Sequence, residues 1–314
     1  MKIVLAGGAG DVGKHLCVYL LKQGHQVTIV DKKAAVFTAV ANAEPTVLQA
    51  DLKDISLLTD IIAGNDIVVN LAWSFSDDPH ELFGNDILGH INLLQAAAAA
   101  RAKRLIYAST AGVYGVPAAS AIEETHCCEP AQARKPLYAV AKHCAEQLSA
   151  VLGCTYGIPT TILRFWWAFG DSISGKHLRE LIKLAIANQP IPMVAEAGGT
   201  FATMDDIGLA VELAATRPHA SGTVYNVGSL YLSWLEIIQV IIDLTGSKSP
   251  LQLTPSAEWT GPAFLNETWQ LSWSKINREL GYRPLLANTN TRQLFRQALA
   301  TCVQQVTKTT SSGK

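Results

Sequence analysis

A glycine-rich turn near the start of the chain constrains the possible folds more than any other feature. The apolar segment 2–6 has the pattern of a short buried strand. Gly7, Gly10 and Gly13 follow at the spacing G-x-x-G-x-x-G, and apolar residues then recur at helical intervals. A strand, a glycine turn and a helix in this order place a pyrophosphate at the helix N-terminus, where free N–H groups and the helix dipole favour anions. The chain therefore starts with a predicted dinucleotide-binding unit.

The end of the next predicted strand indicates which dinucleotide would bind. Segment 26–30 is a second apolar run, and it ends at Asp31, about 20 residues after the glycine turn. A carboxylate at this place accepts hydrogen bonds from the adenosine ribose and repels a 2′-phosphate, so NAD fits better than NADP. Lys32 and Lys33 follow directly and weaken that preference.

Predicted strands and helices alternate as far as residue 165. Apolar runs predict parallel strands at 46–50, 67–71, 104–108 and 160–164. Helical patterns lie between them, at 55–63, 80–100 and 137–152. This alternation predicts an α/β fold with a Rossmann-type, doubly wound parallel sheet, whose ligands bind at the carboxyl ends of the strands.

The character of the chain changes after Arg164. Glycines and prolines interrupt segment 169–204, Asp205 and Asp206 are expected to cap a helix, and 223–227 has the pattern of a strand that returns to the sheet. Further helical patterns occupy 233–244, 274–280 and 292–306. We therefore predict an NAD-binding domain of residues 1–165 and 206–228, a smaller C-terminal substrate lobe of residues 166–205 and 229–306, and a flexible polar tail at 307–314.

Composition narrows the range of partners. The chain has 25 Lys and Arg residues against 26 Asp and Glu residues and shows no basic stripe, which argues against nucleic acid or a membrane surface as partner. Its six cysteines lack paired metal-ligand spacing, so we expect reduced thiols and no metal site. No apolar run has the length of a membrane span or the shape of a signal peptide. A cytoplasmic protein acting on a small molecule is expected.

Tyr138 and Lys142 form the strongest candidate for a catalytic pair. They stand four residues apart in a predicted helix, so their side chains lie on one face of it. We expect the Lys142 ammonium to lower the pKa of the Tyr138 phenol, which lets the phenol exchange protons with an alcohol or carbonyl near neutral pH. The spacing becomes informative because the same chain is predicted to bind a nicotinamide dinucleotide.

Together and in this order, the motifs resemble those of the extended short-chain dehydrogenase/reductases, the NAD-dependent epimerase/dehydratase group. The resemblance covers nearly the whole chain. Besides the glycine turn and Tyr138-x-x-x-Lys142, it rests on Asp51-Leu52, Asn70-Leu71-Ala72, Asn85-x-x-x-Gly89, Ala108-Ser109-Thr110-Ala111-Gly112-Val113-Tyr114-Gly115, Leu163-Arg164-Phe165, Asp205-Asp206 and Tyr225-Asn226-Val227-Gly228.

The resemblance implies a set of cofactor contacts. Asp11 and Val12 would offer backbone N–H groups to the pyrophosphate, and Lys142 would hydrogen-bond the nicotinamide ribose. The other implied contacts to NAD come from Asp31 and Lys32, from Asp51 and Leu52 beside the adenine, from Leu71, Ala72 and Trp73 beside the ribose, and from Asn85, Tyr138, Phe165 and Trp166.

The resemblance also implies the catalytic roles. Tyr138 would be the general base or acid, and Thr110 would hydrogen-bond the reacting oxygen, with Ser109 as its neighbour. Removing a hydride from a carbinol carbon needs such a base on the oxygen and a second group that fixes it. The alternatives are that Ser109 and Thr110 only end a strand, and that Asn85 is a polar helix residue without a catalytic role.

The departures from the family pattern fall at the substrate site. Nucleotide-sugar members usually carry an asparagine where this chain has Trp167, and commonly an arginine in the stretch that corresponds to 198–204, which here has no basic residue. A diphosphate normally attracts charge-assisted donors. Trp166 and Trp167 are open to two interpretations, as stacking surfaces for a substrate or as core residues.

The predicted function is that of an NAD-dependent sugar or nucleotide-sugar epimerase/dehydratase-type oxidoreductase, with Tyr138-assisted hydride transfer at a secondary alcohol. One alternative is a dehydrogenase/reductase of a small non-nucleotide hydroxy or keto substrate. A minor alternative is a non-catalytic NAD-sensing module, although such members commonly lose the tyrosine or lysine that this chain keeps. The resemblance further implies a homodimer through a four-helix bundle formed by segments 80–100 and 137–152.

Overall fold

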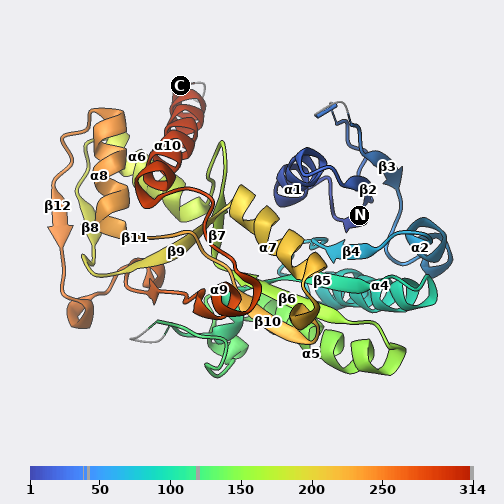
Figure 1. Ribbon diagram of the computed structural model, residues 1–314. Helices are drawn as coiled ribbons and strands as arrows, with labels where there is room; N and C mark the ends of the chain where they lie inside the picture. The colour runs from blue at the N-terminus through green and yellow to red at the C-terminus, as the bar shows by residue number, and fades with distance from the viewer. Residues whose placement is uncertain (38, 41–42, 118–120, 312–314) are drawn as a thin grey trace.

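The computed structural model describes residues 1–37, 39–40, 43–117 and 121–311, and its centre is a seven-stranded parallel sheet (Figure 1). The strand order is β10-β6-β5-β4-β1-β2-β3. The strands are β1 (Lys2–Ala6), β2 (Gln26–Asp31), β3 (Thr46–Gln49), β4 (Ile67–Asn70), β5 (Arg104–Thr110), β6 (Thr160–Phe165) and β10 (Thr223–Asn226). Every neighbouring pair is parallel, which confirms the predicted doubly wound α/β fold.

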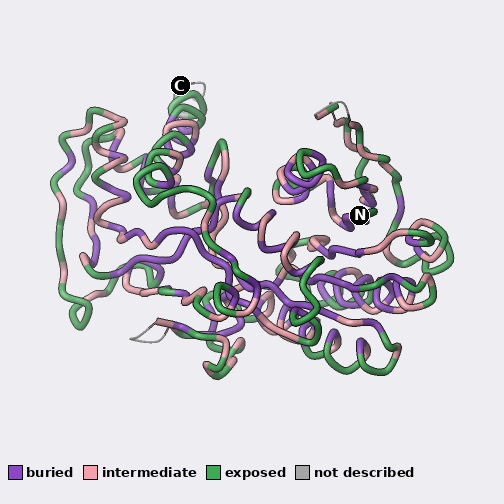
Figure 2. Tube along the Cα trace, in the orientation of Figure 1, coloured by how far each residue is buried: buried purple, intermediate pink, exposed green. Residues whose placement is uncertain are grey.

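Helices cover both faces of this sheet. One face carries α1 (Asp11–Lys22) and α7 (Met204–Thr216), which pack against each other. The other carries α2 (Ile55–Ile62), α4 (Leu88–Ala99) and α5 (Pro136–Tyr156). With both faces covered, the central strands are buried along almost their whole length (Figure 2). The strand sequences are correspondingly apolar runs rather than alternating patterns.

Short elements connect these layers. A single turn, α3 (Pro79–Glu81), and a π-helical segment, η1 (Leu82–Ile87), lead directly into α4. Short 3-10 helices are η2 (Ala111–Tyr114), η3 (Pro130–Gln132), η4 (Pro218–Ala220), η5 (Ser256–Glu258) and η6 (Ala263–Leu265).

The second half of the chain builds a smaller lobe beside the sheet, on the left in Figure 1. Its central strand β9 (Gly198–Thr203) pairs with β7 (Trp167–Phe169), β11 (Leu230–Ser233) and β13 (Thr268–Trp269), and β8 (Ile191–Met193) pairs with β12 (Leu251–Leu253). The helices are α6 (Lys176–Ile186), α8 (Trp234–Thr245) and α10 (Asn288–Ser311). They enclose a separate apolar core that includes Phe169, Phe201 and Trp234.

Two local predictions were wrong in this half. The N-cap of α7 is Thr203, not Asp205 or Asp206, because the Thr203 hydroxyl accepts from the Asp206 N–H while the Asp206 carboxylate is bound by the Ser229 hydroxyl. The polar tail does not begin at 307, since α10 continues to Ser311; residues 312–314 lie outside the described part of the chain.

The last helix before α10 also departs from the predicted division. Helix α9 (Ser274–Leu280) falls in the predicted substrate lobe, yet Ile276 and Leu280 pack in the core of the large sheet. Lys275 Nζ donates to the carbonyl of Val224 in β10, and Tyr282 donates to that of Gly228. The chain therefore returns to the sheet a second time, and the remaining domain limits stay predictions.

Within the described residues, no helix is long and apolar enough to cross a membrane. The same part of the chain holds no cluster of three or more His, Cys, Asp or Glu side chains placed to bind a metal ion.

The glycine turn allows a matched test. Gly7 has φ +80°, and a Cβ there would lie 2.5 Å from backbone atoms of Ala72, whereas Gly24 has φ +79° and open space around it. We expect Gly24→Ala to lower the free energy of unfolding by about 1–2 kcal/mol from backbone strain alone. Gly7→Ala should cost about 1–3 kcal/mol more, because the methyl group collides with fixed backbone. Denaturant titration of both variants measures the difference, and equal losses would contradict the predicted steric role.

Candidate functional site

The predicted site residues meet at one edge of the sheet. The glycine turn follows β1, Asp31 ends β2, Leu71–Trp73 follow β4, Thr110 ends β5, and Phe165 ends β6. All these strands run in the same direction, so their carboxyl ends form a common edge. The sheet thus positions residues from five separate parts of the sequence together.

The turn after β1 has the features of an anion cradle. Gly10 is the N-cap of α1 and gives no side-chain capping bond, which leaves the first N–H groups of the helix for a ligand. Gly13 is pressed against the turn, since a Cβ there would lie 2.5 Å from Gly8 Cα. Asp31 Oδ2 accepts from the N–H of Ala9 at 3.1 Å, which fixes its carboxylate beside the turn. These residues fit a dinucleotide, with Asp31 at the ribose end.

Lys142 is buried under two aromatic rings. It is 4% exposed, and its Nζ donates to the carbonyl of Ala108 at 2.9 Å. The ammonium lies 4.0 Å from the ring centroid of Trp73 and 4.9 Å from that of Tyr107. Trp73 Nε1 and the Tyr107 hydroxyl are buried without a hydrogen-bond partner, so polar atoms beside Lys142 are left for a bound group. Burial lowers the pKa of Lys142 to about 7.

Tyr138 lies one helical turn before Lys142, but the expected effect of the lysine on its pKa was wrong. Burial raises the pKa of the Tyr138 phenol above its usual value, and a hydrogen bond with Thr110 opposes this only in part. The Lys142 ammonium lies 6.0 Å from the Tyr138 ring centroid and is directed to Ala108 instead. The pair does share one face of α5, and Thr110 hydrogen-bonds the phenol; the predicted contact of Thr110 with the reacting oxygen stays a prediction.

Ser109 does not join this group. Its side chain is buried and donates to the carboxylate of Glu146, which also accepts from Arg164 Nε at 2.9 Å and Nη2 at 2.6 Å. Burial acts to raise the pKa of Glu146, but the Arg164 and His143 hydrogen bonds outweigh it and hold that pKa below its usual value. Successive residues of β5 point to opposite sides of the strand. Ser109 therefore binds Glu146 of α5 in the interior of the domain. The predicted catalytic role of Ser109 is corrected to this structural one.

Asp86 is a site residue that the sequence analysis missed. It lies in η1, next to the predicted Asn85, and both of its carboxylate oxygens accept from Ser74. Its charge acts on Lys142 and on Tyr138. One signal in the sequence points to it, an acidic side chain directly beside the motif residue Asn85. Asn85 itself is half-buried, and its contact to NAD stays a prediction.

The two residues predicted to lie beside the adenine are accessible to solvent to different extents. Asp51 is exposed, and Leu52 is half-buried against Gly89 of α4. Phe165 packs against the core of the large sheet. The roles of these residues, of Leu71 and Ala72, and of the exposed Lys32 toward NAD stay predictions.

The two tryptophans after β6 belong mainly to the small lobe. Trp166 covers Gly199, where a Cβ would meet its ring at 1.8 Å, and Trp167 covers Gly175 in the same way at 2.4 Å. The Trp167 ring stacks on Phe201 at 5.6 Å, and its Nε1 donates to the carbonyl of Ser174. Both rings stay half-buried, so core packing accounts for most but not all of their surface.

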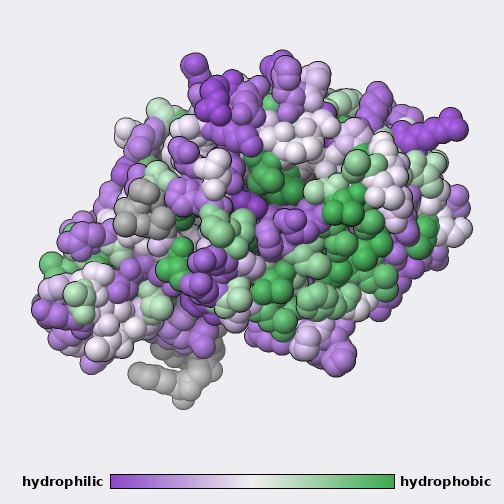
Figure 3. Space-filling view, turned by 90° about the horizontal axis from the view of Figure 1, so that it is seen from below, coloured by the Kyte–Doolittle hydropathy of each residue, from purple (hydrophilic) through white to green (hydrophobic). Residues whose placement is uncertain are grey.

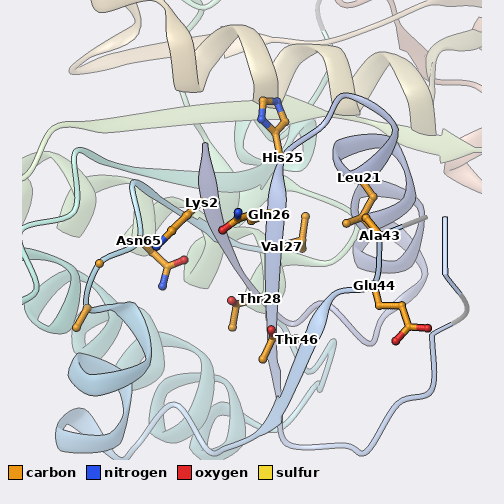
Figure 4. A pocket seen from close by; sticks show the side chains of 12 residues that line it. Lys2, Leu21, His25, Gln26, Val27, Thr28, Ala43, Glu44, Thr46 and Asn65 are labelled. Atoms are coloured by element: carbon orange, nitrogen blue, oxygen red, sulfur yellow. The ribbon is translucent and has the colours of Figure 1, made fainter. Parts of the chain in front are cut away.

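A separate cavity lies at the opposite end of the sheet. It has a volume of about 390 Å³ and is lined from the amino ends of β1, β2 and β3 by residues that include Lys2, Gln26 and Thr46 (Figure 4). Tyr138 and Lys142 belong to the other edge, where the strands end. The cavity therefore has no part in the candidate site.

Comparison with known proteins finds a family match over most of the chain. The model of the NAD dependent epimerase/dehydratase family matches residues 3–228. An uncharacterized UDP-glucose epimerase, YtcB, of Bacillus subtilis is 27% identical over 295 residues, covering 82% of this chain and 89% of its own. The UDP-glucose 4-epimerase of Halalkalibacterium halodurans is 26% identical over 285 residues, covering 81% of this chain and 84% of its own.

Solved structures share the fold. The UDP-glucose-4-epimerase of Stenotrophomonas maltophila, with bound NAD and formylated UDP-arabinopyranose, superposes with a TM-score of 0.77 at 23% identity and covers all of both chains. The dTDP-glucose 4,6-dehydratase DesIV of Streptomyces venezuelae, with bound NAD, has a TM-score of 0.74 at 22% identity, covering 97% of this chain and 96% of its own.

Proposed function

The chain belongs to the NAD-dependent epimerase/dehydratase family, and we propose that it oxidises a secondary alcohol of a sugar or nucleotide sugar with Tyr138 as the proton-transferring residue. NAD is the cofactor of this family, and the turn after β1 fits it. The observation that carries the proposal is the grouping of Tyr138, Thr110 and Lys142 at the sheet edge where that turn lies. Net oxidation, epimerisation and dehydration all begin with this step.

The chain's residues supply the proton chemistry. Tyr138 acts as a base in the phenolate form, after its own proton has passed to solvent, and then takes the proton of the substrate hydroxyl. Thr110, which hydrogen-bonds the phenol, holds the same substrate oxygen in place. Lys142 supplies positive charge close to the site from beneath Trp73. Bound NAD supplies the acceptor for the hydride that leaves the carbinol carbon. Gly7, Gly10 and the start of α1 would hold its pyrophosphate, and Asp31, fixed beside the turn by the N–H of Ala9, would bind its adenosine ribose.

A second candidate is a dehydrogenase/reductase of a small hydroxy or keto compound without a nucleotide. It is favoured by the small lobe, where Trp167 is committed to Phe201 and Ser174. In addition, β9 and the residue after it contain no basic side chain that could bind a diphosphate. The nucleotide-sugar candidate is supported by the functions for which the relatives are named, which are those of UDP-glucose epimerases.

We also propose a cytoplasmic homodimer. The face formed by α4 and α5 exposes apolar side chains, among them Leu88 at 41% and Val151 at 62% (Figure 3). Contiguous apolar surface of this kind favours a protein partner, and helices of two copies could pack across it. All six cysteines are free, which supports a reducing compartment.

The proton-transfer role is tested by Tyr138→Phe, which removes only the hydroxyl. We expect kcat to fall by about 10²- to 10⁴-fold while the melting temperature stays close to that of the parent protein. Tyr156→Phe is the matched control, because Tyr156 is on the same helix and its hydroxyl accepts from Gln95, away from the site. Near-normal turnover of Tyr138→Phe would refute the proposed function.

The substrate class is tested by thermal shift in the presence of NAD. A UDP-sugar, UDP alone and the matching free sugar are compared at equal concentration. The first candidate predicts that the UDP-sugar raises the melting temperature most, because ligand binding stabilises the folded state as the ratio of concentration to Kd rises. A larger shift from small keto compounds than from any nucleotide would favour the second candidate.

The dimer is tested by Val151→Glu, which puts a charge on the α4–α5 face. We expect this variant to be monomeric in size-exclusion chromatography with light scattering, since burying an unpaired carboxylate at an interface is costly. Leu253→Glu is the control, because Leu253 is similarly exposed at 58% but lies in β12 of the small lobe. A monomeric parent protein would contradict the proposed dimer.

A further inference from the structure

The loop after β4 places two aromatic rings around Tyr138. Trp73 meets the Tyr138 ring edge-on, at 6.3 Å between centroids, and Phe75 stacks on it at 5.5 Å with planes 16° apart. Phe75 is 65% exposed and has φ +56°, a conformation that costs a non-glycine residue free energy. Other interactions of the loop must offset this free-energy cost.

Asp86 provides such interactions. Ser74, between the two aromatic residues, donates from its N–H to both Asp86 oxygens at 3.1 Å and from its hydroxyl at 2.6 Å. Asp86 is 9% exposed, so its carboxylate is largely withdrawn from water. Burial raises the pKa of Asp86, whereas the Ser74 donors and the charge of Lys142 act in the opposite direction and favour the carboxylate.

Most titratable groups around Lys142 are neutral, so few of them can balance the charge of its ammonium. Tyr107 from β5 and Tyr138 from its own helix are neutral phenols with raised pKa values. His90 from α4 is neutral, because burial lowers its pKa to about 3. Only Asp86 and Glu146 act on the lysine as negative charges within the described residues.

Glu146 cannot serve as a free counter-charge. Its carboxylate forms a two-point ion pair with Arg164, at 2.9 and 2.6 Å, so the two charges largely cancel. In the part of the chain that the structure describes, Asp86 has no such ion-pair partner, and the cations that act on it are Lys142 and the exposed Lys32. The positive charge of the buried Lys142 ammonium is therefore balanced mainly by the Asp86 carboxylate in η1.

We propose that Asp86 is a positioning residue whose carboxylate keeps Lys142 an ammonium and, through Ser74, holds Trp73 against it. This role rests on the proposed function, since it prepares the lysine beside Tyr138.

The expected pH effect follows from the signs of the charges. Burial lowers the pKa of Lys142 to about 7, and Asp86 acts to raise it. Replacing Asp86 by asparagine removes the raising effect, so the Lys142 pKa falls further. At neutral pH a larger fraction of Lys142 is then the neutral amine, which no longer attracts the Trp73 ring.

Trp73 fluorescence gives a readout that does not depend on turnover. The difference between the emission of the parent protein and that of Trp73→Phe is followed from pH 5 to 10. We expect a transition that is absent in Lys142→Met and that moves down by about one pH unit or more in Asp86→Asn. Asp77→Asn changes an exposed carboxylate of the same loop, 82% accessible, so it should not move the midpoint.

An unchanged midpoint in Asp86→Asn would overturn the proposal, as would an equal shift in Asp77→Asn. If Asp86→Asn does not fold, melting temperatures decide. Lys142→Met leaves a buried carboxylate without its cation, so the double variant Asp86→Asn/Lys142→Met should melt higher than Lys142→Met alone. A double variant that melts no higher contradicts the pairing. The fluorescence and melting measurements do not depend on enzyme activity, whereas the Tyr138→Phe test does. The role of Asp86 and the proposed function can therefore be refuted separately.

Discussion

The helix that carries Tyr138 and Lys142 is held on the sheet by a buried ion pair, and the geometry of the site depends on it. Glu146, one turn after Lys142, binds Arg164 of β6 at two points and accepts from Ser109 of β5. A buried pair adds little net stability, because desolvation offsets the attraction, yet losing one partner costs about 3–5 kcal/mol. The ion pair therefore determines the position of α5 against β5 and β6, and it contributes less to the free energy of unfolding.

That arrangement has an electrostatic consequence one turn away. Because α5 is held close to the sheet, both members of the catalytic pair are withdrawn from water, and burial shifts each pKa toward the uncharged form. A phenol and an ammonium therefore do not activate each other merely by lying on one helix face. The charge of Lys142 depends on a carboxylate from another element, and Asp86 in η1 is placed to supply it.

The sequence allowed the fold and the cofactor end of the site to be predicted, because both depend on local patterns. Gly7 and Asp31 mark the ends of two apolar runs, and parallel pairing then brings them together without further information. The hydrogen-bond partners of individual side chains could not be predicted in this way, because they depend on residues distant in sequence. Thr203 rather than Asp206 caps α7, because Asp206 is bound by Ser229, a residue distant in sequence.

Asp86 could not be predicted for a different reason, because the family motif Asn85-x-x-x-Gly89 does not include it and helical spacing does not point to it either. Spacing arguments on a helix assume 3.6 residues per turn, but η1 is π-helical and each of its turns holds more residues. Residues on either side of such a segment are out of phase with an α-helical count. The sequence pattern shows a helix over 80–100 and contains no sign of this change.

The side chains of the small lobe bear on the proposed substrate. Gly199 and Gly175 leave room for Trp166 and Trp167, so these rings are built into the lobe and present flat, half-buried surfaces. Positive charge occurs at the rim of the aromatic cluster, where the Arg134 guanidinium lies 5.9 Å from the ring centroid of Phe264. A nucleotide sugar would need donors for its diphosphate from outside β9, because β9 has no basic side chain. A substrate without phosphate would need only the aromatic faces and the hydroxyl-binding groups of the large domain.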